Sequence, residues 1–390
     1  MKVCHVITRM IIGGAQENTL FSIYGLMDAG HQVELVTGPS PGPEGELLKN
    51  SGKNVDLKVV ECPDLVRNIS PLQDWKAYRF LLNYFRSNKF DVVHTHSSKA
   101  GIIGRLAAHA AGVPLVVHTV HGLAFHRFEK PWKNWIYILL EKIAAAKCHK
   151  IYAVAQAMIN QCLAAGIGKK EQYQVVYSGM ELEPFLTSEK DEDLRKELNI
   201  PESAKVLGTV ARLFPLKGYE ELFKVIPSLI VEFPDLHFLF VGDGSLRQTL
   251  EAQAEAGGFR DRISFAGLIP PAQVYRYVAQ MDILVHFSLR EGLPRAVVQG
   301  LASGKPAVAY NLDGTPEVVL SGKTGFLVEP GDTAGIRDAL NILLTDDDAR
   351  IRMGQNGRAL VRDLFGWKRM ADILMNDYEN ELAKKRINSR

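Results

Sequence analysis

Cysteine is scarce in this chain of 390 residues and does not occur in pairs. Cys4, Cys62, Cys148 and Cys162 lie far apart in the sequence. Zinc sites use closely spaced ligands, and disulfide-stabilised folds are dense in cysteine. The sequence therefore predicts neither, and it favours a protein of a reducing compartment.

The chain also lacks an excess of charge of either sign and a long apolar run. Its 46 Lys and Arg residues nearly balance 44 Asp and Glu residues, for a net charge of +2, which argues against a nucleic-acid binder held by bulk charge. No uninterrupted apolar run is long enough to span a bilayer. The start, residues 1–7, is typical of a first strand rather than of a signal peptide. We expect a cytoplasmic protein, with peripheral contact at the inner face of the membrane left open.

What is present is a regular alternation of short apolar runs and longer helical patterns. Such alternation predicts parallel sheets covered by helices on both faces, and the length predicts two or three domains. The strands expected in the first half are residues 2–8, 32–37, 91–95, 115–120 and 150–154, and the helices are residues 15–29, 72–87, 98–111, 131–147 and 155–164.

A charged segment with two prolines, residues 181–202, is predicted to link this series to a second one and to include a short helix. Doubly wound sheets of this kind bind ligands at the carboxyl ends of their strands. The second series has expected strands at 205–211, 237–241, 283–287 and 306–310, and expected helices at 217–232, 245–256, 272–280, 294–303, 333–344 and 347–363.

The most informative segment is Arg-Glu-Gly-Leu-Pro-Arg-Ala-Val-Val-Gln at residues 290–299, which follows an expected strand. Pro294 suits the first position of a helix, and Gly304 suits its end. The free N–H groups at a helix start attract phosphate, so the amides of Gly292 and Leu293 are candidate diphosphate ligands.

Three charged side chains complete this candidate site. A carboxylate repels phosphate, so Glu291 is better suited to accept hydrogen bonds from sugar hydroxyls. Arg212 and Lys217 follow the first strand of the second series, where two fixed cations can hold a diphosphate without a metal. The alternative for the pair is solvated surface charge.

The segment 290–299 resembles the signature of glycosyltransferase family 4, and Arg212-Leu213 with Lys217-Gly218 resembles that family's Arg-Leu and Lys-Gly motif. The resemblance covers essentially the whole chain. It implies an α/β GT-B fold: two facing Rossmann-like, doubly wound domains with a central cleft and a C-terminal crossover helix. It further implies an acceptor domain at 1–182 joined by the crossover helix 366–384, and a donor domain for the nucleotide-sugar at 183–365.

The resemblance also implies roles for individual residues in the donor domain. Glu291 would contact the donor sugar and act in catalysis, and Gly267 with Leu268 would lie near the nucleotide base. Glu317 is a secondary candidate near the donor. Gln299 stands where the family has a second glutamate that contacts the ribose, and this departure puts the strength of ribose binding in question.

In the first domain the same resemblance selects a glycine loop and a histidine. Gly14, with Gly13 as a secondary candidate, would lie near the diphosphate; the alternative is an ordinary strand-to-helix turn. His121 would lie beside the donor sugar as a catalytic residue, with His118 as the secondary choice.

Two further groups of residues are open to a metal interpretation. His94 and His96 share one face of an expected strand and could line the acceptor side. No third and fourth ligand with clear spacing accompanies them, so we expect no metal. The acidic runs 191–193 and 346–348 are read as solvated charge.

The stretch 125–137 mixes aromatic side chains with cations. This composition suits a lipid headgroup surface. It equally suits an amphipathic helix packed on its own sheet, and both interpretations stay open.

Together these features predict a metal-independent, cofactor-free retaining glycosyltransferase of the hexosyltransferase type. Its partners would be a nucleotide-diphosphate sugar and a sugar or lipid-linked sugar acceptor, in polysaccharide or lipid-linked glycan synthesis. Two alternatives remain: a nucleotide-sugar 2-epimerase of the same fold, and a non-catalytic sugar-nucleotide-binding subunit, for which Gln299 is the only hint.

Overall fold

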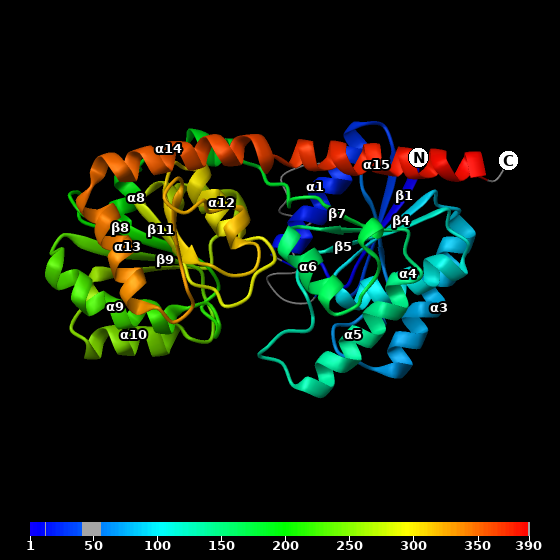
Figure 1. Ribbon diagram of the computed structural model, residues 1–390, viewed down its shortest axis with the longest axis horizontal. Coiled ribbons are helices and arrows are strands. Elements are labelled where there is room, and N and C mark those ends of the chain that lie inside the picture. Colours follow the sequence, from blue (N-terminus) through cyan, green and yellow to red (C-terminus); the bar gives the residue numbers. More distant parts are fainter. Residues whose placement is uncertain (12, 41–55, 389–390) are drawn as a thin grey trace. The chain divides into compact units, whose positions relative to one another are not determined.

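The computed structural model describes residues 1–11, 13–40 and 56–388. The chain divides into two compact units, Met1–Met180 with Gly366–Arg390, and Glu181–Phe365. Each unit is a parallel sheet with helices on both faces (Figure 1). The prediction of two Rossmann-like α/β domains is therefore confirmed.

The sheet of the first unit has the strand order β3-β2-β1-β4-β5-β6-β7 among the described residues. All of its strand pairs are parallel. The strand order reverses between β1 and β4, and in such sheets ligands bind beyond the carboxyl ends at that point. The strands are β1 (Lys2–Ile7), β2 (Gln32–Thr37), β3 (Lys58–Glu61), β4 (Val92–His96), β5 (Leu115–Val120), β6 (Lys150–Ala153) and β7 (Tyr173–Val175).

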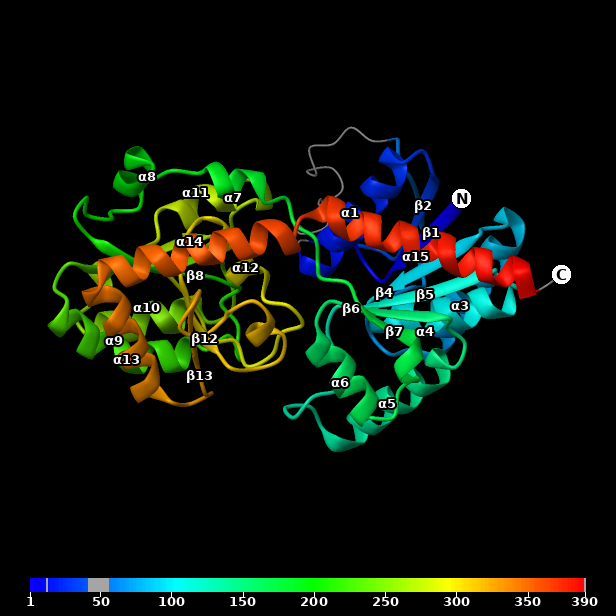
Figure 2. The same ribbon diagram turned by 45° about the horizontal axis from the view of Figure 1, so that its top comes forward.

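The last helix, α15 (Trp367–Asn388), belongs to the first unit and lies alongside α1 (Gly14–Asp28) (Figures 1 and 2). The approach is close, since a Cβ atom on Gly25 would lie 2.1 Å from the Cβ of Ala371. The other α-helices among the described residues of this unit are α3 (Pro71–Asn88), α4 (Ser98–Ala110), α5 (Pro131–Ala145) and α6 (Gln156–Ala164).

The sheet of the second unit has the order β10-β9-β8-β11-β12-β13 and is also parallel. Its strands are β8 (Lys205–Val210), β9 (Leu236–Val241), β10 (Ile263–Gly267), β11 (Ile283–His286), β12 (Ala307–Tyr310) and β13 (Gly325–Val328). Its helices are α7 (Glu183–Thr187), α8 (Glu192–Glu197), α9 (Tyr219–Glu232), α10 (Arg247–Ala256), α11 (Val274–Ala279), α12 (Arg295–Ala302), α13 (Thr333–Thr345) and α14 (Asp347–Leu364).

The sequence analysis did not predict the strands β3, β7 and β13. It also did not predict β10 as a strand, although Gly267 at its end was a candidate residue. All four lie at sheet edges. An edge strand has a neighbour on one side only, and β3 and β7 have no buried residue. They consequently lack the apolar run by which a central parallel strand is recognised. Among the described helices, none combines the length and apolar character needed to span a bilayer.

Candidate active site

Two loops of the second unit meet at the carboxyl edge of its sheet, because β8 and β11 are neighbours. One loop joins β8 to α9 and the other joins β11 to α12. The Leu289 N–H donates to the Leu216 carbonyl at 2.9 Å. Gly218 has φ +79°, and a Cβ there would lie 2.2 Å from the Phe287 carbonyl oxygen. The two loops therefore fit together only with glycine at this position.

This contact brings a lysine, a glutamate and a histidine together. Lys217 Nζ lies 2.6 Å from Glu291 Oε1 and 3.3 Å from the Ser288 hydroxyl. His286 Nε2 lies 3.3 Å from the same Glu291 oxygen. The Lys217 and Glu291 side chains are 25% and 18% exposed, so this ion pair is largely shielded from solvent.

The cluster keeps Glu291 ionised. Burial raises the pKa of the Glu291 carboxyl, but the charges of Lys217 and His286 outweigh burial, and the net pKa lies well below the ordinary value. A permanently ionised carboxylate is an acceptor for hydroxyl donors and not a proton donor. This electrostatic state agrees with the sugar-binding role expected for Glu291.

The backbone of Glu291 is also fixed. Its N–H donates to Asp313 Oδ2 at 2.9 Å. Asp313 follows β12 and adopts a left-handed backbone, with φ 51°. The sequence analysis singled out Glu317 from this loop and missed Asp313. The sequence signal that could have selected Asp313 is an acidic residue directly before a glycine, shortly after an expected strand.

Helix α12 begins one residue later than expected. Pro294 is its N-cap and not its first helical residue, and its carbonyl accepts from the Val297 and Val298 amides. The prediction for Gly304 is correct, since it has φ +70° and follows Ser303, the C-cap of the helix. Gln299 lies within α12 and is half-buried.

The remaining donor-side candidates also follow strands of this sheet. Arg212 is exposed, with its guanidinium 5.4 Å from the Phe214 ring centroid. Gly267 ends β10 with φ +76°, its carbonyl accepts from the Gly242 amide, and Leu268 beside it is 48% exposed. Gly292 and Glu317 are half-buried, and the Leu293 side chain is buried. Because the sheet is parallel, all these positions share its carboxyl edge.

In the first unit, Gly13 is the N-cap of α1 and Gly14 is its first residue.

His121, which follows β5, belongs to a chain of three imidazoles. Its Nε2 lies 3.0 Å from His96 Nδ1, and His96 Nε2 lies 2.9 Å from His5 Nδ1. His5 and His96 are fully buried. Burial lowers the pKa of His5 to about 3, and burial with the neighbouring histidines holds the pKa of His96 well below its usual range. Both imidazoles are therefore neutral at pH 7.

His94 does not line an acceptor surface, because it is fully buried. Its Nδ1 pairs with the Tyr378 hydroxyl of α15 at 2.5 Å, and its Nε2 pairs with the Thr119 hydroxyl at 2.7 Å.

The sequence analysis found no third histidine beside His94 and His96, but the structure places His5 there. One nitrogen from each of His5, His94 and His96 lies within 4.8 Å of the others, close enough to share a metal ion. Hydrogen bonds already occupy both nitrogens of His94 and His96, so these contacts describe a hydrogen-bonded cluster.

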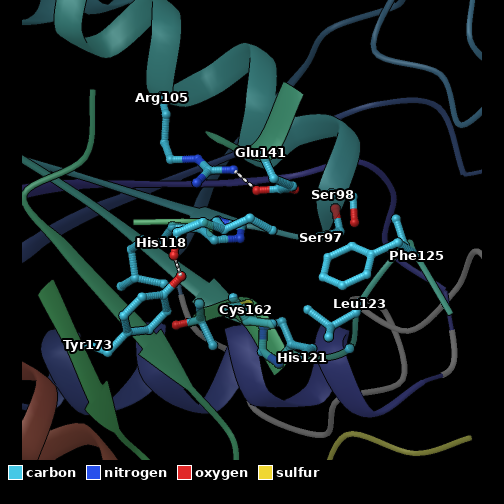
Figure 3. Close-up of a pocket in the computed structure, with 16 residues that line it drawn as sticks. Ser97, Ser98, Arg105, His118, His121, Leu123, Phe125, Glu141, Cys162 and Tyr173 are labelled. Carbon is cyan, nitrogen blue, oxygen red and sulfur yellow. Dashed lines mark hydrogen bonds and ion pairs between the residues drawn. The ribbon is translucent and has the colours of Figure 1, made fainter. Parts of the chain in front are cut away.

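His118 points to the opposite face of the first sheet. Its Nδ1 pairs with the Thr95 hydroxyl at 2.9 Å, and a Cβ on Gly101 would lie 2.5 Å from its ring. It lines a pocket with His121 and the ion pair Arg105–Glu141, whose N–O distance is 2.5 Å (Figure 3). His121 and His118 thus reach this pocket from two sides, and Phe125 and Leu123 close it at the loop (Figure 3).

Comparisons with known families match both units. Residues 190–360 match the model described as glycosyl transferases group 1, and residues 13–179 match the model of the glycosyl transferase 4-like domain. A UDP-Gal:alpha-D-GlcNAc-diphosphoundecaprenol alpha-1,3-galactosyltransferase of Escherichia coli is 30% identical, over 99% of this chain and 98% of its own length. A D-inositol 3-phosphate glycosyltransferase of Corynebacterium glutamicum is 26% identical, over 96% of this chain and 93% of its own length.

Solved structures share the fold at low identity. The crystal structure of Anabaena Alr3699/HepE in complex with UDP and glucose is similar with a TM-score of 0.83 and 21% identity, covering 97% of this chain and 100% of that one. A sucrose-phosphate synthase of Thermosynechococcus elongatus has a TM-score of 0.81 at 19% identity, covering 98% of this chain and 100% of that one.

Proposed function

Because the chain belongs to the group 1 glycosyltransferases and has their GT-B fold, we propose that it is a metal-independent, retaining hexosyltransferase. It moves a sugar from a nucleotide-diphosphate sugar to a hydroxyl acceptor. The observation that carries the proposal is the cluster of Lys217, Glu291 and His286 at the carboxyl edge of the second sheet.

The donor would be held by the second unit. Negative charge grows on the diphosphate as it leaves the sugar, and fixed cations oppose that charge most strongly in the transition state. Lys217 has three N–H donors, so it can keep its bond to Glu291 and still donate to a phosphate oxygen. Arg212 lies on the same loop and is exposed to a ligand. These two cations make a metal unnecessary for charge neutralisation.

The acceptor would be held by the first unit. The Escherichia coli relative is named for a sugar on a lipid diphosphate, which favours an acceptor of that class. His121 would contact the donor sugar. Its partner His96 is buried and neutral, so the bond between them orients the His121 ring without adding a positive charge.

A panel of nucleotide-sugars tests the proposal. We expect slow hydrolysis of one donor without acceptor and transfer with retained anomeric configuration when a lipid-diphosphate sugar is added, both measured by NMR. Release of an epimerised sugar would instead indicate the 2-epimerase. Nucleotide binding without any turnover would indicate a non-catalytic subunit.

Replacing Glu291 by the isosteric glutamine should lower kcat/KM by about 10- to 100-fold, because the hydroxyl acceptor loses its charge and a hydrogen bond to a charged group contributes about 1.5–3 kcal/mol. Steady-state transfer assays measure the effect, with Glu221→Gln on α9 as the control. Unchanged kcat/KM in Glu291→Gln would remove this carboxylate from the mechanism.

Restoring the family's acid with Gln299→Glu should leave donor affinity unchanged or improve it. A carboxylate accepts from both ribose hydroxyls, whereas the amide oxygen offers one acceptor group beside two donors. Isothermal titration with the nucleotide measures the affinity. A collapse of binding would show that the amide itself is required.

A further inference from the structure

The outer face of α5 carries an unusual set of exposed apolar side chains. Trp132 is 60% exposed, Trp135 66%, Leu139 40% and Ile143 46%, and Phe128 before the helix is 44% exposed. Large aromatic side chains are seldom so open to water, and a contiguous exposed apolar patch marks an interaction site.

These side chains form one stripe. At about 100° per residue, Trp132, Trp135, Leu139 and Ile143 fall within about 80° of the helix circumference. The opposite face of α5 packs inward, with Ala144 and Ala145 buried and Glu141 paired to the buried Arg105. The sequence analysis left two interpretations of the stretch 125–137 open. One of them, an amphipathic helix packed on its own sheet, explains only the inner face of α5.

Cations border the stripe. Arg127, Lys130, Lys142 and Lys147 are exposed, and Lys133 lies over the Trp132 ring at 5.9 Å from its centroid. Both acids of the segment have cationic partners, since Glu141 pairs with Arg105 of α4 and Glu129 lies 3.4 Å from Lys133. The face thus combines tryptophan with a net positive charge, the pattern by which a helix lies in the interface of an anionic bilayer.

The loop before α5 is held in place. The Asn134 side chain accepts from the His126 amide at 3.1 Å and donates to the His126 carbonyl at 2.9 Å. This clamp fixes Phe128 and Arg127 next to the helix start. In both ribbon views α5 lies at the outer margin of the first unit (Figures 1 and 2).

We propose that the outer face of α5, formed by Phe128, Trp132, Trp135, Leu139 and Ile143 with the bordering cations, docks on the surface of an anionic lipid bilayer. A second copy of the chain is a poor occupant, because two such faces would bring like charges together. The inner side of the same helix and its loop supply Glu141, Phe125 and Leu123 to the pocket that contains His118 and His121. Docking would consequently hold that pocket next to the headgroup layer, where lipid-linked sugars are displayed. The docking itself does not depend on the proposed reaction.

Vesicle co-sedimentation tests the proposal. The full chain should bind vesicles of phosphatidylcholine and phosphatidylglycerol, with weaker binding at high salt and to phosphatidylcholine alone. The double change Trp132→Ser and Trp135→Ser should lower the partition coefficient by more than about tenfold. Lys130→Ser with Lys133→Ser should lower binding to the anionic vesicles only.

The matched control is Ile342→Ser with Ile351→Ser, which removes two exposed apolar side chains from the second unit. It should bind vesicles like the unchanged protein, and donor hydrolysis should be the same in all variants. Absence of binding at low salt, or equal binding by the tryptophan variant, would overturn the proposal. So would light scattering that shows a dimer lost on the tryptophan change, because a second copy would then cover the face.

Discussion

Replacing Lys217 by methionine should lower kcat/KM by about 10² to 10³-fold, the usual cost of losing one donor to a developing oxyanion. Methionine keeps most of the length of the side chain but removes the ammonium that lies 2.6 Å from Glu291. The loss should appear in kcat as well as in donor affinity, because the charge on the leaving diphosphate is greatest in the transition state.

The same change also affects the resting protein. Among the described side chains, Glu291 would keep the imidazole of His286 as a close partner but lose its ammonium partner, so the pKa of Glu291 should rise and the unit should lose about 1–3 kcal/mol of stability. Lys224→Met on α9 is the control, since the Lys224 side chain is 61% exposed and its ammonium group pairs with Glu221. Equal activity of Lys217→Met and Lys224→Met would contradict the role of Lys217.

The first unit should lose stability steeply as the pH falls below about 6.5. Burial holds the pKa values of His5, His94, His96 and His118 below the ordinary value of 6.5. The folded unit keeps these groups neutral, whereas the unfolded chain protonates them. Their contribution is thus fully present above the unfolded pKa and is lost as the pH falls toward the folded values.

Each buried histidine should contribute a slope of about 1.4 kcal/mol per pH unit, so the four together approach about 5 kcal/mol per unit well below pH 6.5. All four tryptophans of the chain, Trp75, Trp132, Trp135 and Trp367, lie in the first unit. Urea unfolding followed by tryptophan emission at several pH values therefore reports on this unit alone.

Controls separate the buried cluster from other titrations. His109→Gln changes an exposed histidine of α4 and should leave the slope as it is. His94→Gln should reduce the slope of the unfolding free energy against pH by the contribution of one proton. This result is expected whatever the change does to stability at pH 7. A stability that does not depend on pH between 7 and 5 would contradict the neutral, buried state of these imidazoles.

The sequence predicted the central strands well because a strand buried on both faces must be apolar along its length. It missed β3 and β7, which lie at sheet edges and have no buried residue. The placement of Pro294 was off by one position, since an N-cap and a first helical residue differ only in backbone angles that no residue type determines alone.

For the candidate site, the local pattern together with the family resemblance selected Glu291 and Lys217, and the structure brings the two side chains together because β8 and β11 are neighbours. The local pattern was not enough for contacts between distant segments. Tyr378 and His94 are 284 positions apart, and His5 joins His96 across 91 positions. His5 gave no signal of its own, since a single histidine in a first strand looks like any other core residue. The separate domain roles and the residue roles stay predictions.

A crystal structure with a bound nucleoside diphosphate tests the central claim most directly. The account predicts phosphate oxygens within hydrogen-bonding distance of Lys217 Nζ and the Arg212 guanidinium, next to the amides of Gly292 and Leu293, with the Glu291 carboxylate free of phosphate contacts. A diphosphate bound at any other place, with Lys217 still paired only to Glu291 and Ser288, would contradict it.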